Sequence, residues 1–557
     1  MEVCILKIRL KTEPRGEFRD FEVKKGTRIE EIYRQVRDEL PYTVLLAKVG
    51  NEYQDLNFVI EEECSVELLD VRTQAANLVY QYGLVLIYLT AVKHVLGDTE
   101  MIIDNSLNQG LYVYALEGAS GREIHQIEDE MRRLVEEDIP IEHHRYSSEE
   151  GIKLLIEMKR YANLRELQFL PEKEHLDFYR LEDYQDYFYG KMVPSTGYIR
   201  HFELRSYRGG VLIRFPLPAN PDVIPEYKDQ VRLAEAFDEQ GRWDRLLGVD
   251  YVGDLNKKIV RGEAKELMML SEALHEKKIA EIADMIMKRK KRIILIAGPS
   301  SSGKTTFARR LCIQLKVNGM DALYMGTDDY FVERSQTPLD EHGEPNYEDL
   351  DAIDIGLFNQ NMNDLLAGRE VDLPTFNFIE GKKEYGKRIT RLRHGQPIVI
   401  EGIHGLNGKL TEQIPAEEKF KIYISPLTQL NIDEHVRIPT TDERMLRRMV
   451  RDYQFRAHDA RSTIADWPKV RAGEDKNIFP YSDEADVLFN SYHVYEISVL
   501  KKYAQPLLEK IRPDEPEYAE AQRILKFLNF FLPIEDDSVI VNNSILREFI
   551  GGSVFVE

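Results

Sequence analysis

The 557-residue sequence predicts a multidomain α/β protein whose C-terminal half contains a doubly wound parallel sheet. Three observations lead to this fold class. The chain is too long for one hydrophobic core, so several domains are expected. Short apolar runs alternate with helical stretches after Lys291, the pattern of parallel strands covered by helices on both faces. One run leads directly into a glycine-rich turn, residues 298–305, that opens a helix.

Composition places the chain among globular proteins and argues against some partners. Apolar residues make up 43% and charged residues 31%, both ordinary values. The 75 basic and 97 acidic residues give a net charge of −22, which disfavours a broad nucleic-acid surface but leaves a local basic groove open. The widely spaced Cys4, Cys64 and Cys312 suggest neither a disulfide framework nor a zinc site.

No membrane partner is expected from the sequence. The first residues, MEVCILKIRLK, alternate like a strand and lack the apolar core and cleavage site of a secretory leader. The longest apolar stretch, residues 83–92, is too short to span a bilayer and is interpreted as part of a buried helix. We therefore expect a cytoplasmic protein.

Residues 1–70 are predicted to form short strands around one helix. Alternating residues favour strands at 3–9, 18–23 and 65–69, and helical periodicity favours a helix at 28–39. This segment resembles a TGS domain, the ubiquitin-like β-grasp module found on threonyl-tRNA synthetases. The resemblance implies a β-grasp domain over residues 1–70.

Residues 71–220 are predicted to form an α+β domain, with a buried helix at 75–96, a strand at 109–116 and an amphipathic helix at 122–137. Its segments LNQGLY, EDIPI and VPSTG resemble the second additional (editing) domain of threonyl-tRNA synthetases. Editing in that family needs two His and a Cys-His pair, and the aligned positions here are Tyr82, Leu86, Phe188 and Met192. None of these suits zinc, so we expect no hydrolytic site.

A proline-rich run near residue 220 marks a boundary. Residues 221–290 are mainly helical and charged, which predicts a helical connector packed on the C-terminal domain. Residues 291–557 then form the last predicted domain, with apolar strands at 293–297, 322–325, 398–400, 421–424 and 487–489.

The clearest motif is G-P-S-S-S-G-K-T at 298–305, between a strand and a helix. Glycines let the main chain wrap around phosphate, Lys304 reaches the β- and γ-phosphates, and Thr305 can ligate Mg²⁺. The flanking strand and helix disfavour a simple Gly/Ser-rich turn. The predicted ATP-binding residues of the loop are Gly298, Ser300, Ser301, Ser302, Gly303, Lys304, Thr305 and Thr306.

Further segments lie downstream of the loop: TDDYF (327–331), NYEDLDAID (346–354), PTFNF (374–378), PIVIEG (397–402) and DERMLRRMVRD (442–452). Together with the loop they resemble the uridine kinase family of nucleoside kinases over residues 292–491. The resemblance implies a P-loop kinase domain that uses ATP and Mg²⁺.

The resemblance places the nucleoside on the first three segments. Asp328 occupies the position of the acid at the substrate 5′-hydroxyl, where a carboxylate takes the proton as the γ-phosphoryl arrives. A turn-capping Asp is the alternative, and Asp329 could instead support the metal. Glu348 stands where the family has an Asp on the ribose hydroxyls, with helix capping as the alternative. Tyr330 joins the predicted substrate-binding set.

Phe376 and Phe378 stand where two aromatics flank the nucleobase in the family, although strand phenylalanines are also common in cores. Phe376 replaces a Tyr, and Gly381 replaces a His that contacts the base. Both departures remove polar discrimination, so the resemblance does not fix the base.

The remaining two segments resemble a metal-facing strand end and a lid helix. Glu401 is predicted to hold Mg²⁺ with Thr305, unless it is a plain strand-end charge. For Arg444 and Arg447 a solvated helix face is preferred. The resemblance implies that Arg448, Arg451 and Arg456 contact phosphate, and Arg456 is therefore added to the predicted ATP-binding residues. The predicted catalytic set is Asp328, Lys304, Arg448 and Arg451, with Arg448 also contacting substrate. His458 stands where the family has a further Arg.

The predicted function is transfer of phosphate from ATP to the 5′-hydroxyl of a nucleoside, uridine or cytidine. Two alternatives stay open: a kinase of another small hydroxylated metabolite, and an RNA- or tRNA-responsive regulator that uses ATP as a switch. The expected partners are ATP, Mg²⁺ and the nucleoside. Nucleic acid is disfavoured by charge, while tRNA and a homo-oligomer are left open.

Overall fold

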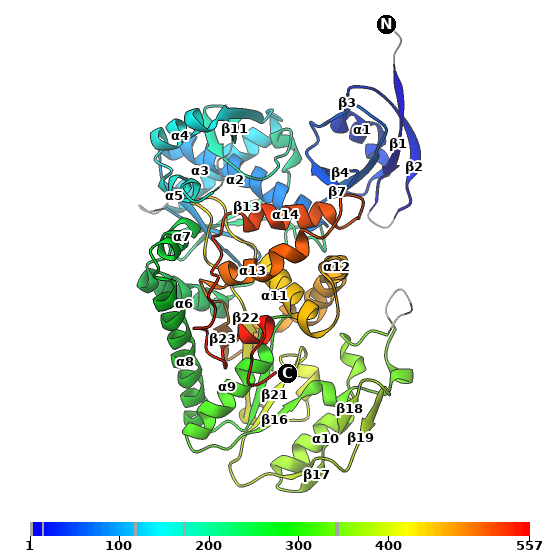
Figure 1. Ribbon diagram of the computed structural model, residues 1–557, viewed down its shortest axis with the longest axis vertical. Coiled ribbons are helices and arrows are strands. Elements are labelled where there is room, and N and C mark those ends of the chain that lie inside the picture. Colours follow the sequence, from blue (N-terminus) through cyan, green and yellow to red (C-terminus); the bar gives the residue numbers. More distant parts are fainter. Residues whose placement is uncertain are drawn as a thin grey trace.

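The computed structural model describes residues 4–13, 16–115, 120–170, 174–339, 343 and 345–556. Figure 1 shows the N-terminal modules (blue and cyan) at one end and the parallel-sheet module (green to yellow) at the other. The C-terminal helices (orange to red) lie between them, in the middle of the structure.

The first module is the predicted β-grasp fold. Its sheet has the order β2-β1-β7-β4-β5, with β1 parallel to β7, and α1 covers it through buried Ile32 and Val36. Alternation in β1 buries Ile8 and Leu10 and exposes their neighbours. The elements are β1 (Ile5–Lys11), β2 (Arg19–Lys24), β3 (Thr27–Arg28), α1 (Ile29–Val36), η1 (Arg37–Glu39), β4 (Val44–Val49), β5 (Glu52–Gln54), β6 (Val59–Ile60) and β7 (Ser65–Asp70).

The second module is built on the long apolar helix α2, flanked by the sheets β13-β14-β9-β8 and β10-β11-β12. By length and composition α2 could cross a membrane, but 83% of its apolar window is buried inside the structure, as in a core helix. The elements are α2 (Gln74–Leu96), β8 (Met101–Leu107), β9 (Gly110–Ala115), α3 (Gly121–Glu136), β10 (Glu142–Ser147), α4 (Ser148–Glu157), α5 (Tyr161–Leu167), β11 (His175–Leu181), β12 (Tyr184–Tyr187), η2 (Thr196–Tyr198), β13 (Glu203–Tyr207) and β14 (Gly210–Arg214).

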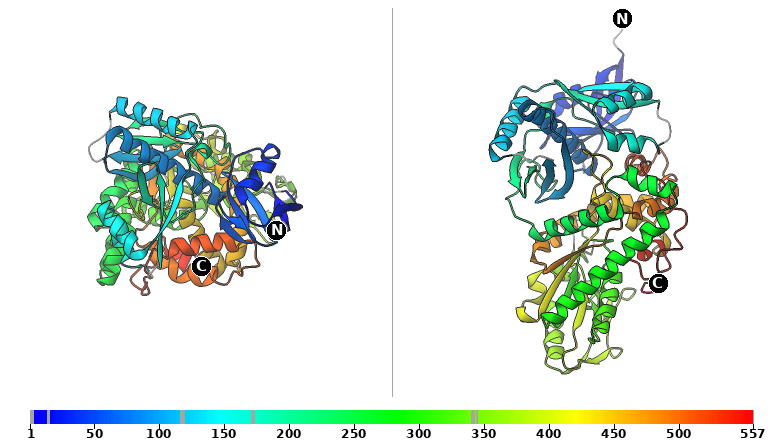
Figure 2. Two further views of the ribbon diagram at one scale, coloured as in Figure 1. Left: turned by 90° about the horizontal axis from the view of Figure 1, so that it is seen from above. Right: turned by 90° about the vertical axis from the view of Figure 1, so that its left-hand side faces the viewer.

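Three helices connect this module to the parallel sheet: α6 (Val231–Leu247), α7 (Val252–Val260) and α8 (Ala264–Lys288). Helix α8 buries Ile279, Ile282 and Ile286 and lies along α9, the helix of the phosphate-binding motif. Figure 2 shows the same long green helix running down the side of the parallel-sheet module.

The C-terminal sheet has the order β16-β21-β15-β22-β23, and every strand pair in it is parallel. Its strands are the predicted apolar runs: β16 (Leu323–Gly326), β21 (Ile398–Glu401), β15 (Ile293–Ala297), β22 (Lys419–Ser425) and β23 (Val487–Asn490). Because β15 is buried along its whole length, helices must cover both faces, as the sequence predicts.

The remaining elements surround this sheet: α9 (Lys304–Val317), η3 (Thr327–Tyr330), η4 (Arg334–Gln336), η5 (Leu350–Ala352), α10 (Ile355–Leu366), β17 (Glu370–Asp372), β18 (Thr375–Asn377), β19 (Lys382–Glu384), β20 (Ile389–Arg391), η6 (Gly408–Thr411), η7 (Ala416–Glu418), α11 (Thr440–Phe455), α12 (Ala460–Asn477), η8 (Phe479–Glu484), α13 (Glu496–Leu508), α14 (Tyr518–Leu528) and α15 (Arg547–Ile550).

One hydrophobic cluster joins parts of all the modules. This contiguous cluster of buried side chains reaches from Leu45 in β4 through α2 and α8 to Ile550 in α15. The β-grasp module also has a separate core around Ile8, Ile32 and Leu68, and the parallel-sheet module has a second cluster around Ile293 and Phe358. Helix α14 returns to the first module, where the Tyr53 hydroxyl donates to Glu520 at 3.3 Å.

Candidate active site

The phosphate-binding loop connects the carboxyl end of β15 in the parallel sheet to α9. A Cβ at Gly298 would lie 2.0 Å from the carbonyl oxygen of Ile424 in β22, so this position has no room for a side chain. Gly303 has a φ of 84°, in the left-handed region, and a Cβ there would meet Ile545 at 2.4 Å. Neither position therefore has room for a side chain, Gly298 because of the neighbouring strand and Gly303 because of its left-handed backbone and Ile545.

Polar groups of the loop converge on its hollow. The Lys304 ammonium donates to the carbonyl oxygens of Gly298 at 2.9 Å and Pro299 at 3.0 Å, and burial lowers its pKa. The hydroxyls of Ser301 and Ser302 are buried without a hydrogen-bond partner among the described residues. Unpaired buried hydroxyls are costly, and a phosphate in the loop would satisfy them.

Oxygen ligands for a cation lie at the edge of this loop. The Thr305 hydroxyl donates to the Glu401 carboxylate at 2.8 Å, and the Tyr324 hydroxyl donates to the same oxygen at 2.9 Å. A hydroxyl and a carboxylate are the hard donors that Mg²⁺ prefers, so these residues fit the predicted metal. The hydroxyl of Tyr324 orients Glu401, a role that the sequence did not predict.

Asp328 lies in η3, directly after β16, in the electrostatic field of Glu401 and Lys304. Burial, with a smaller contribution from the Glu401 carboxylate, raises its pKa to about 6, and the Lys304 charge opposes both. The residue keeps an open side toward solvent, and water on that side limits the effect of burial. A carboxyl group with this pKa is suited to general-base catalysis near neutral pH.

The carboxylate of Asp329 forms its hydrogen bonds away from Thr305 and Glu401. Its carboxylate accepts from Arg388 at 2.5 Å and from the main-chain N–H of Phe376 at 3.4 Å. These bonds tie η3 to β18, so Asp329 positions the neighbouring strand, and the structure gives it no contact with Thr305 or Glu401.

Glu348 reaches the same region from the loop before η5. Its carboxylate packs against α12 at Gly473, where an added Cβ would lie 1.8 Å from the Glu348 oxygen. Burial and then the nearby Glu474 raise its pKa to about 7, while Arg448 and Lys304 oppose the shift. The structure thus brings Glu348 and the loop lysine into one site.

Three arginines of the predicted lid share a single acid, Asp452. Arg451 donates to it at 2.8 Å, Arg448 lies 3.3 Å from it, and Arg456 lies 3.6 Å from it. Arg448 also donates to the hydroxyl of Ser300 at 2.9 Å, which joins the lid helix α11 to the phosphate loop. Sequence reasoning missed Asp452 as the residue that gathers these charges.

The expectation that Arg444 and Arg447 face solvent is wrong. Arg444 is buried and forms a bidentate ion pair with Glu474. Arg447 has no exposed surface and pairs with Glu496 at 2.6 Å. Each also donates to a loop carbonyl, Arg444 to Ser300 and Arg447 to Ser301, both at 3.3 Å. They were misassigned because their partners come from α12 and α13, which helical spacing within α11 cannot show.

Glu474 is a further residue that sequence reasoning missed. Its carboxylate accepts the main-chain N–H of Ser300 at 2.9 Å, so it contacts the phosphate loop itself. Burial favours the neutral acid, but the charge and hydrogen bonds of Arg444, the Arg471 charge and the N–H of Ser300 together lower the pKa of Glu474. No motif marks this position, 174 residues after Ser300.

The predicted aromatic pair lies beside η3. The rings of Phe376 and Phe378 are 5.1 Å apart, and Phe331 packs edge-on against both, at 5.6 and 6.2 Å. Phe376 is buried, whereas Phe378 is 58% exposed and presents the open apolar surface of the group. A planar ligand could stack only on this exposed side.

Tyr330 does not reach the site. Its side chain is fully buried, its hydroxyl accepts from Asn361 at 3.2 Å, and its ring packs against Phe358 at 5.1 Å. Its predicted role in substrate binding is therefore corrected to a core role. Successive residues of η3 point to different sides, and the sequence pattern does not reveal which side faces the core.

Gly381, which stands where the resemblance expects a His, has a φ of 68°, and an added Cβ would meet Arg334 at 2.7 Å. Arg334 donates from its main chain to the Gly381 carbonyl at 2.9 Å and from its guanidinium to the Phe378 carbonyl at 2.6 Å. A cationic donor thus lies next to the exposed aromatic surface, and the sequence did not indicate it.

Thr306 is held by the C-terminal segment. Its main-chain N–H and its hydroxyl both donate to Glu548 of α15, at 3.2 and 2.7 Å. Thr306 has no exposed surface, so its predicted contact with ATP would require Glu548 to move. Such a contact, 242 residues away in the chain, is invisible in the motif.

The second module has no metal-binding set at the aligned editing positions. Leu86, Phe188 and Met192 are buried, and Tyr82 packs against Phe188 with ring centroids 6.0 Å apart. These four side chains thus take part in the packing of the second module.

Comparisons with known proteins find two kinds of similarity in this chain. Residues 293–498 match the model of the Phosphoribulokinase / Uridine kinase family. The chain is also 28% identical over 207 residues to the threonine–tRNA ligase of Acetivibrio thermocellus, a match that covers 37% of this chain and 32% of the ligase. The chain therefore spans about a third of the length of these curated relatives.

Among solved structures, a possible uridine kinase from Bacillus stearothermophilus aligns with 20% identity and a TM-score of 0.26, covering 38% of this chain and 97% of that one. D-glycerate 3-kinase from Cryptococcus neoformans aligns with 13% identity and a TM-score of 0.21, covering 46% and 86%. The family match supports a P-loop phosphotransferase domain and leaves the acceptor open.

Proposed function

We propose, starting from the match of residues 293–498 to the phosphoribulokinase/uridine kinase family, that the protein phosphorylates the 5′-hydroxyl of a nucleoside, uridine or cytidine, with ATP. The observation that carries this proposal is the position of Asp328. Its carboxyl group has a pKa of about 6 and interacts electrostatically with Lys304 and with Glu401, the proposed Mg²⁺ ligand. A site that only binds nucleotide has no need of such a base.

In the proposed reaction the Asp328 carboxylate takes the proton of the 5′-hydroxyl as its oxygen attacks the γ-phosphorus. The bond between the γ-phosphorus and the bridging oxygen breaks, and negative charge develops on ADP. Lys304 and the main-chain N–H groups of the loop stabilise that charge, and Arg448 and Arg451 stabilise the oxygens of the transferring group. The chain contributes mainly positioning and electrostatics.

Mg²⁺ would be held by Thr305 and Glu401, and when bound it neutralises charge on the phosphate oxygens. Glu348 is proposed to bind the ribose. With a pKa of about 7, it can act as donor or acceptor toward a ribose hydroxyl.

Specificity for the base is proposed to come from Phe378 and Arg334. The exposed ring offers a stacking surface, and the Arg334 guanidinium offers donors beside it. Guanidinium donors suit carbonyl acceptors, so uracil, with two carbonyl oxygens, is favoured over cytosine with one.

A substrate panel tests the proposal. ADP release is followed with Mg²⁺-ATP and uridine, cytidine, adenosine, ribose, a sugar phosphate or glycerate as acceptor. A pyrimidine nucleoside is expected to accelerate turnover most, with the 5′-monophosphate as product. Acceleration only by a non-nucleoside acceptor would sink the nucleoside assignment but leave a kinase.

The strongest competing function is phosphorylation of another small hydroxylated metabolite. Gly381 supplies no side chain to read a base, and Phe378 is open to solvent. Arg334→Ala separates the two functions: it should raise the KM for uridine several-fold, and should leave the KM unchanged for an acceptor that does not reach Phe378.

A further inference from the structure

A large cavity lies at the amino ends of the parallel strands, opposite the phosphate loop. It has a volume of about 550 Å³ and is lined by Met287, Lys290, Lys291, Arg292, Met320, Leu366, Ala367, Gly368, Arg391, Leu392, Arg393, His394 and Gly395. This size lies within the range of small-molecule sites. The roles proposed above for the active site use none of these residues.

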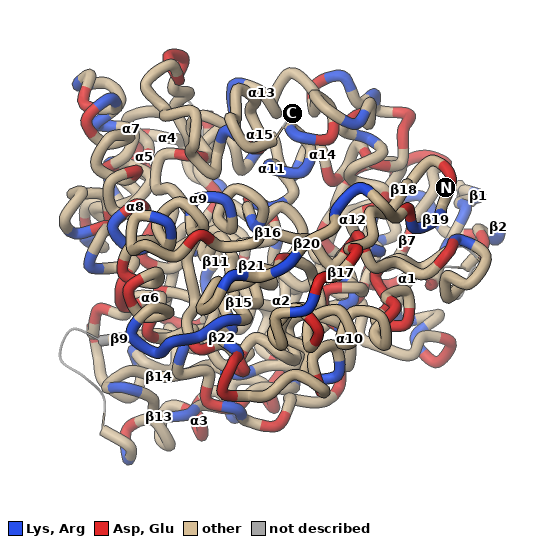
Figure 3. Tube along the Cα trace, turned by 90° about the horizontal axis from the view of Figure 1, so that it is seen from below, with Lys and Arg blue, Asp and Glu red and all other residues tan. Residues whose placement is uncertain are grey.

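The lining is strongly cationic. It contains Lys290, Lys291, Arg292, Arg391 and Arg393, and among its described residues there is no Asp or Glu. The chain as a whole carries −22, so this cavity runs against the overall charge. Figure 3 shows Lys and Arg gathered in blue stretches around β20 and β21, on the side seen from below.

Two distant basic segments build the cavity. One is the KRKKR run at 288–292, which ends α8 and leads into β15; the other is KRITRLRH at 387–394, which includes β20. They meet because β15 and β21 are neighbouring parallel strands, whose amino ends lie at the same edge of the sheet. A single run of like charges usually lies on a solvated surface. Two basic runs that line the same cavity instead add up to a strong positive electrostatic potential inside it.

Main-chain carbonyls, and not carboxylates, hold most of these cations. Arg292 donates to Leu366 at 3.2 Å, Arg391 to Gly368 at 2.8 Å, and Lys291 to Glu417 at 2.7 Å, in each case to the carbonyl oxygen. The Arg292 Nε is buried without a hydrogen-bond partner among the described residues. Arg393 is 3.8 Å from Asp321 and remains mostly exposed. Within the described part of the chain, Asp321 is the only carboxylate that forms an ion pair with these five cations, so most of their charge is not neutralised there.

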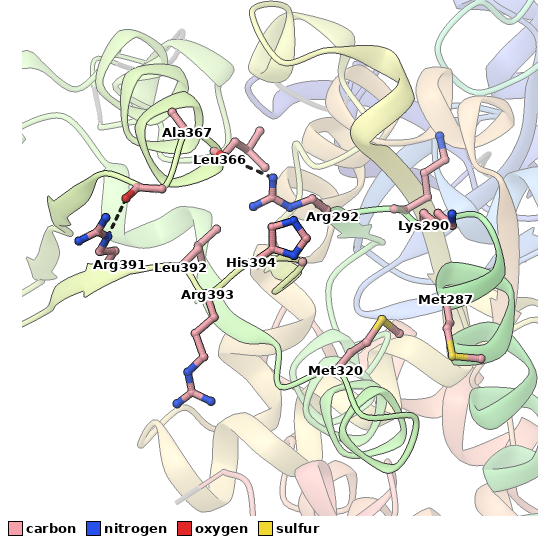
Figure 4. A pocket seen from close by; sticks show the side chains of 13 residues that line it. Met287, Lys290, Arg292, Met320, Leu366, Ala367, Arg391, Leu392, Arg393 and His394 are labelled. Carbon is pink, nitrogen blue, oxygen red and sulfur yellow. Dashed lines mark hydrogen bonds between the residues drawn. The ribbon is translucent and has the colours of Figure 1, made fainter.

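The cavity also has an apolar side. Met287 and Met320 lie together on one flank in Figure 4, and Leu366 and Leu392 add to the apolar lining. Methionine adapts to irregular or planar ligands, and arginine forks bind phosphate oxygens in pairs. A ligand with a phosphate group and a flat or apolar body would satisfy both halves of the lining.

We propose that this cavity is a second anion site, separate from the active site, that binds a small phosphorylated ligand of nucleotide type. The five residues of β15 separate it from the phosphate loop, roughly 17 Å at about 3.3 Å per residue. One ligand therefore cannot fill both sites. The concave shape favours a compact ligand over an extended polymer.

The test uses the full chain and ATP as the probe, titrated by calorimetry in EDTA at low salt. Lys304→Ala serves as the background, because it weakens the phosphate loop. One site is expected to remain in that background. Adding Arg391→Glu and Arg393→Glu should weaken it at least tenfold, and Arg391→Gln with Arg393→Gln should give an intermediate loss. Thermal unfolding verifies that each variant is folded.

The matched control is Lys153→Glu with Arg232→Glu, which changes the charge equally at exposed positions outside the cavity. The control should bind ATP as the background does. Equal weakening by both pairs would show only a net-charge effect and overturn the proposal, as would no binding in the Lys304→Ala background.

Two further probes identify the ligand class. Inorganic phosphate should compete with ATP but bind more weakly, because it lacks the apolar body. A 12-nucleotide single-stranded RNA that binds at least tenfold more tightly than ATP would instead indicate a nucleic-acid surface and overturn the small-ligand proposal. Uridine phosphorylation by the Arg391→Glu, Arg393→Glu chain tests the kinase separately, so the two proposals can fail independently.

Discussion

Asp328 and Glu474 are two carboxylates of one site that differ in their charged partners. Glu474 is paired with Arg444 and keeps a low pKa, so it stays charged and holds the phosphate loop. Asp328 has no such pairing, and burial together with Glu401 raises its pKa to about 6. Of these two acids, Asp328 is the one that can exchange a proton near neutral pH.

Replacing Asp328 by Asn should lower kcat by about 10²–10⁴-fold, the usual contribution of general-base catalysis. The KM for ATP should change little, because the loop is untouched. Steady-state kinetics measure both values. Asp351→Asn, an exposed acid of the same module, is the control and should leave kcat unchanged. A near-normal rate for Asp328→Asn would remove this residue from the mechanism.

The pH dependence of the reaction is set by the same group. A base acts when deprotonated, so kcat/KM of the wild type should fall as the pH drops through about 6. A pH–rate profile from about one unit above this pKa to about two units below it measures this limb. A flat profile across that range would contradict the assignment of Asp328 as the base.

Glu474→Gln should destabilise the C-terminal module by about 3–5 kcal/mol, since it leaves the Arg444 charge buried and unpaired. The folded-state pKa of Glu474 is lowered, so the pair stabilises the fold above the unfolded pKa, and its contribution is lost as pH falls through the folded one. Calorimetric unfolding at neutral pH measures the loss. An unchanged unfolding temperature would show that the pair contributes little.

Among the elements, α11 is the one that connects the site to the rest of the fold. Arg444 and Arg447 are buried and donate to the loop carbonyls of Ser300 and Ser301. They are paired with Glu474 and Glu496, respectively. The other arginines of the predicted lid gather on Asp452 and face the site. The helix therefore acts as a rigid support on one face and a source of positive charge on the other.

Asp452→Asn should lower kcat/KM for ATP about tenfold, or ~1.4 kcal/mol, because the three arginines lose the charge that orients them. Initial rates at varied ATP concentration measure this effect. Asp466→Asn, an exposed acid on α12, is the control for the same change at a position outside the site. Unaltered kinetics would mean that the arginines are oriented by other contacts.

Across the molecule, the modules depend on one another. The core cluster runs without interruption from Leu45 to Ile550, and α8 covers α9 with its buried face. Arg523 of α14 pairs with buried Asp442 of α11 at 2.7 and 2.8 Å, and Gln74 of α2 bonds to the same acid. These contacts join the start of α2 to the helix that supports the phosphate loop.

A chain that begins near Lys291 should therefore aggregate or unfold at a much lower temperature than the full chain. Removing α8 exposes the apolar face of α9, and burial of apolar surface contributes about 25 cal/mol per Å². Gel filtration and thermal unfolding of the truncated chain measure this dependence. A soluble, monodisperse fragment with normal kinase activity would contradict it.

Elements whose signal is local could be identified from the amino-acid sequence alone. Apolar runs predicted the strands of the parallel sheet because burial on both faces demands uninterrupted apolar residues. The phosphate loop was recognisable because its residues, 298–305, form a continuous motif between an apolar strand and a helix. The absent editing set was likewise evident from residue types at Tyr82, Leu86, Phe188 and Met192.

Only the tertiary structure decided which charged side chains are buried and which distant segments of the chain contact each other. The sequence pattern predicted a solvent-facing Arg444, but Glu474 of α12 pairs with it in the folded chain. The motif likewise predicted that Thr306 contacts ATP, but Glu548 of α15 accepts its hydrogen bonds. The basic cavity likewise forms only because the neighbouring parallel strands β15 and β21 place two runs of Lys and Arg at the same edge of the sheet. The cause is the same in each case: burial and electrostatic fields depend on distances in space, which helical spacing and strand alternation do not encode.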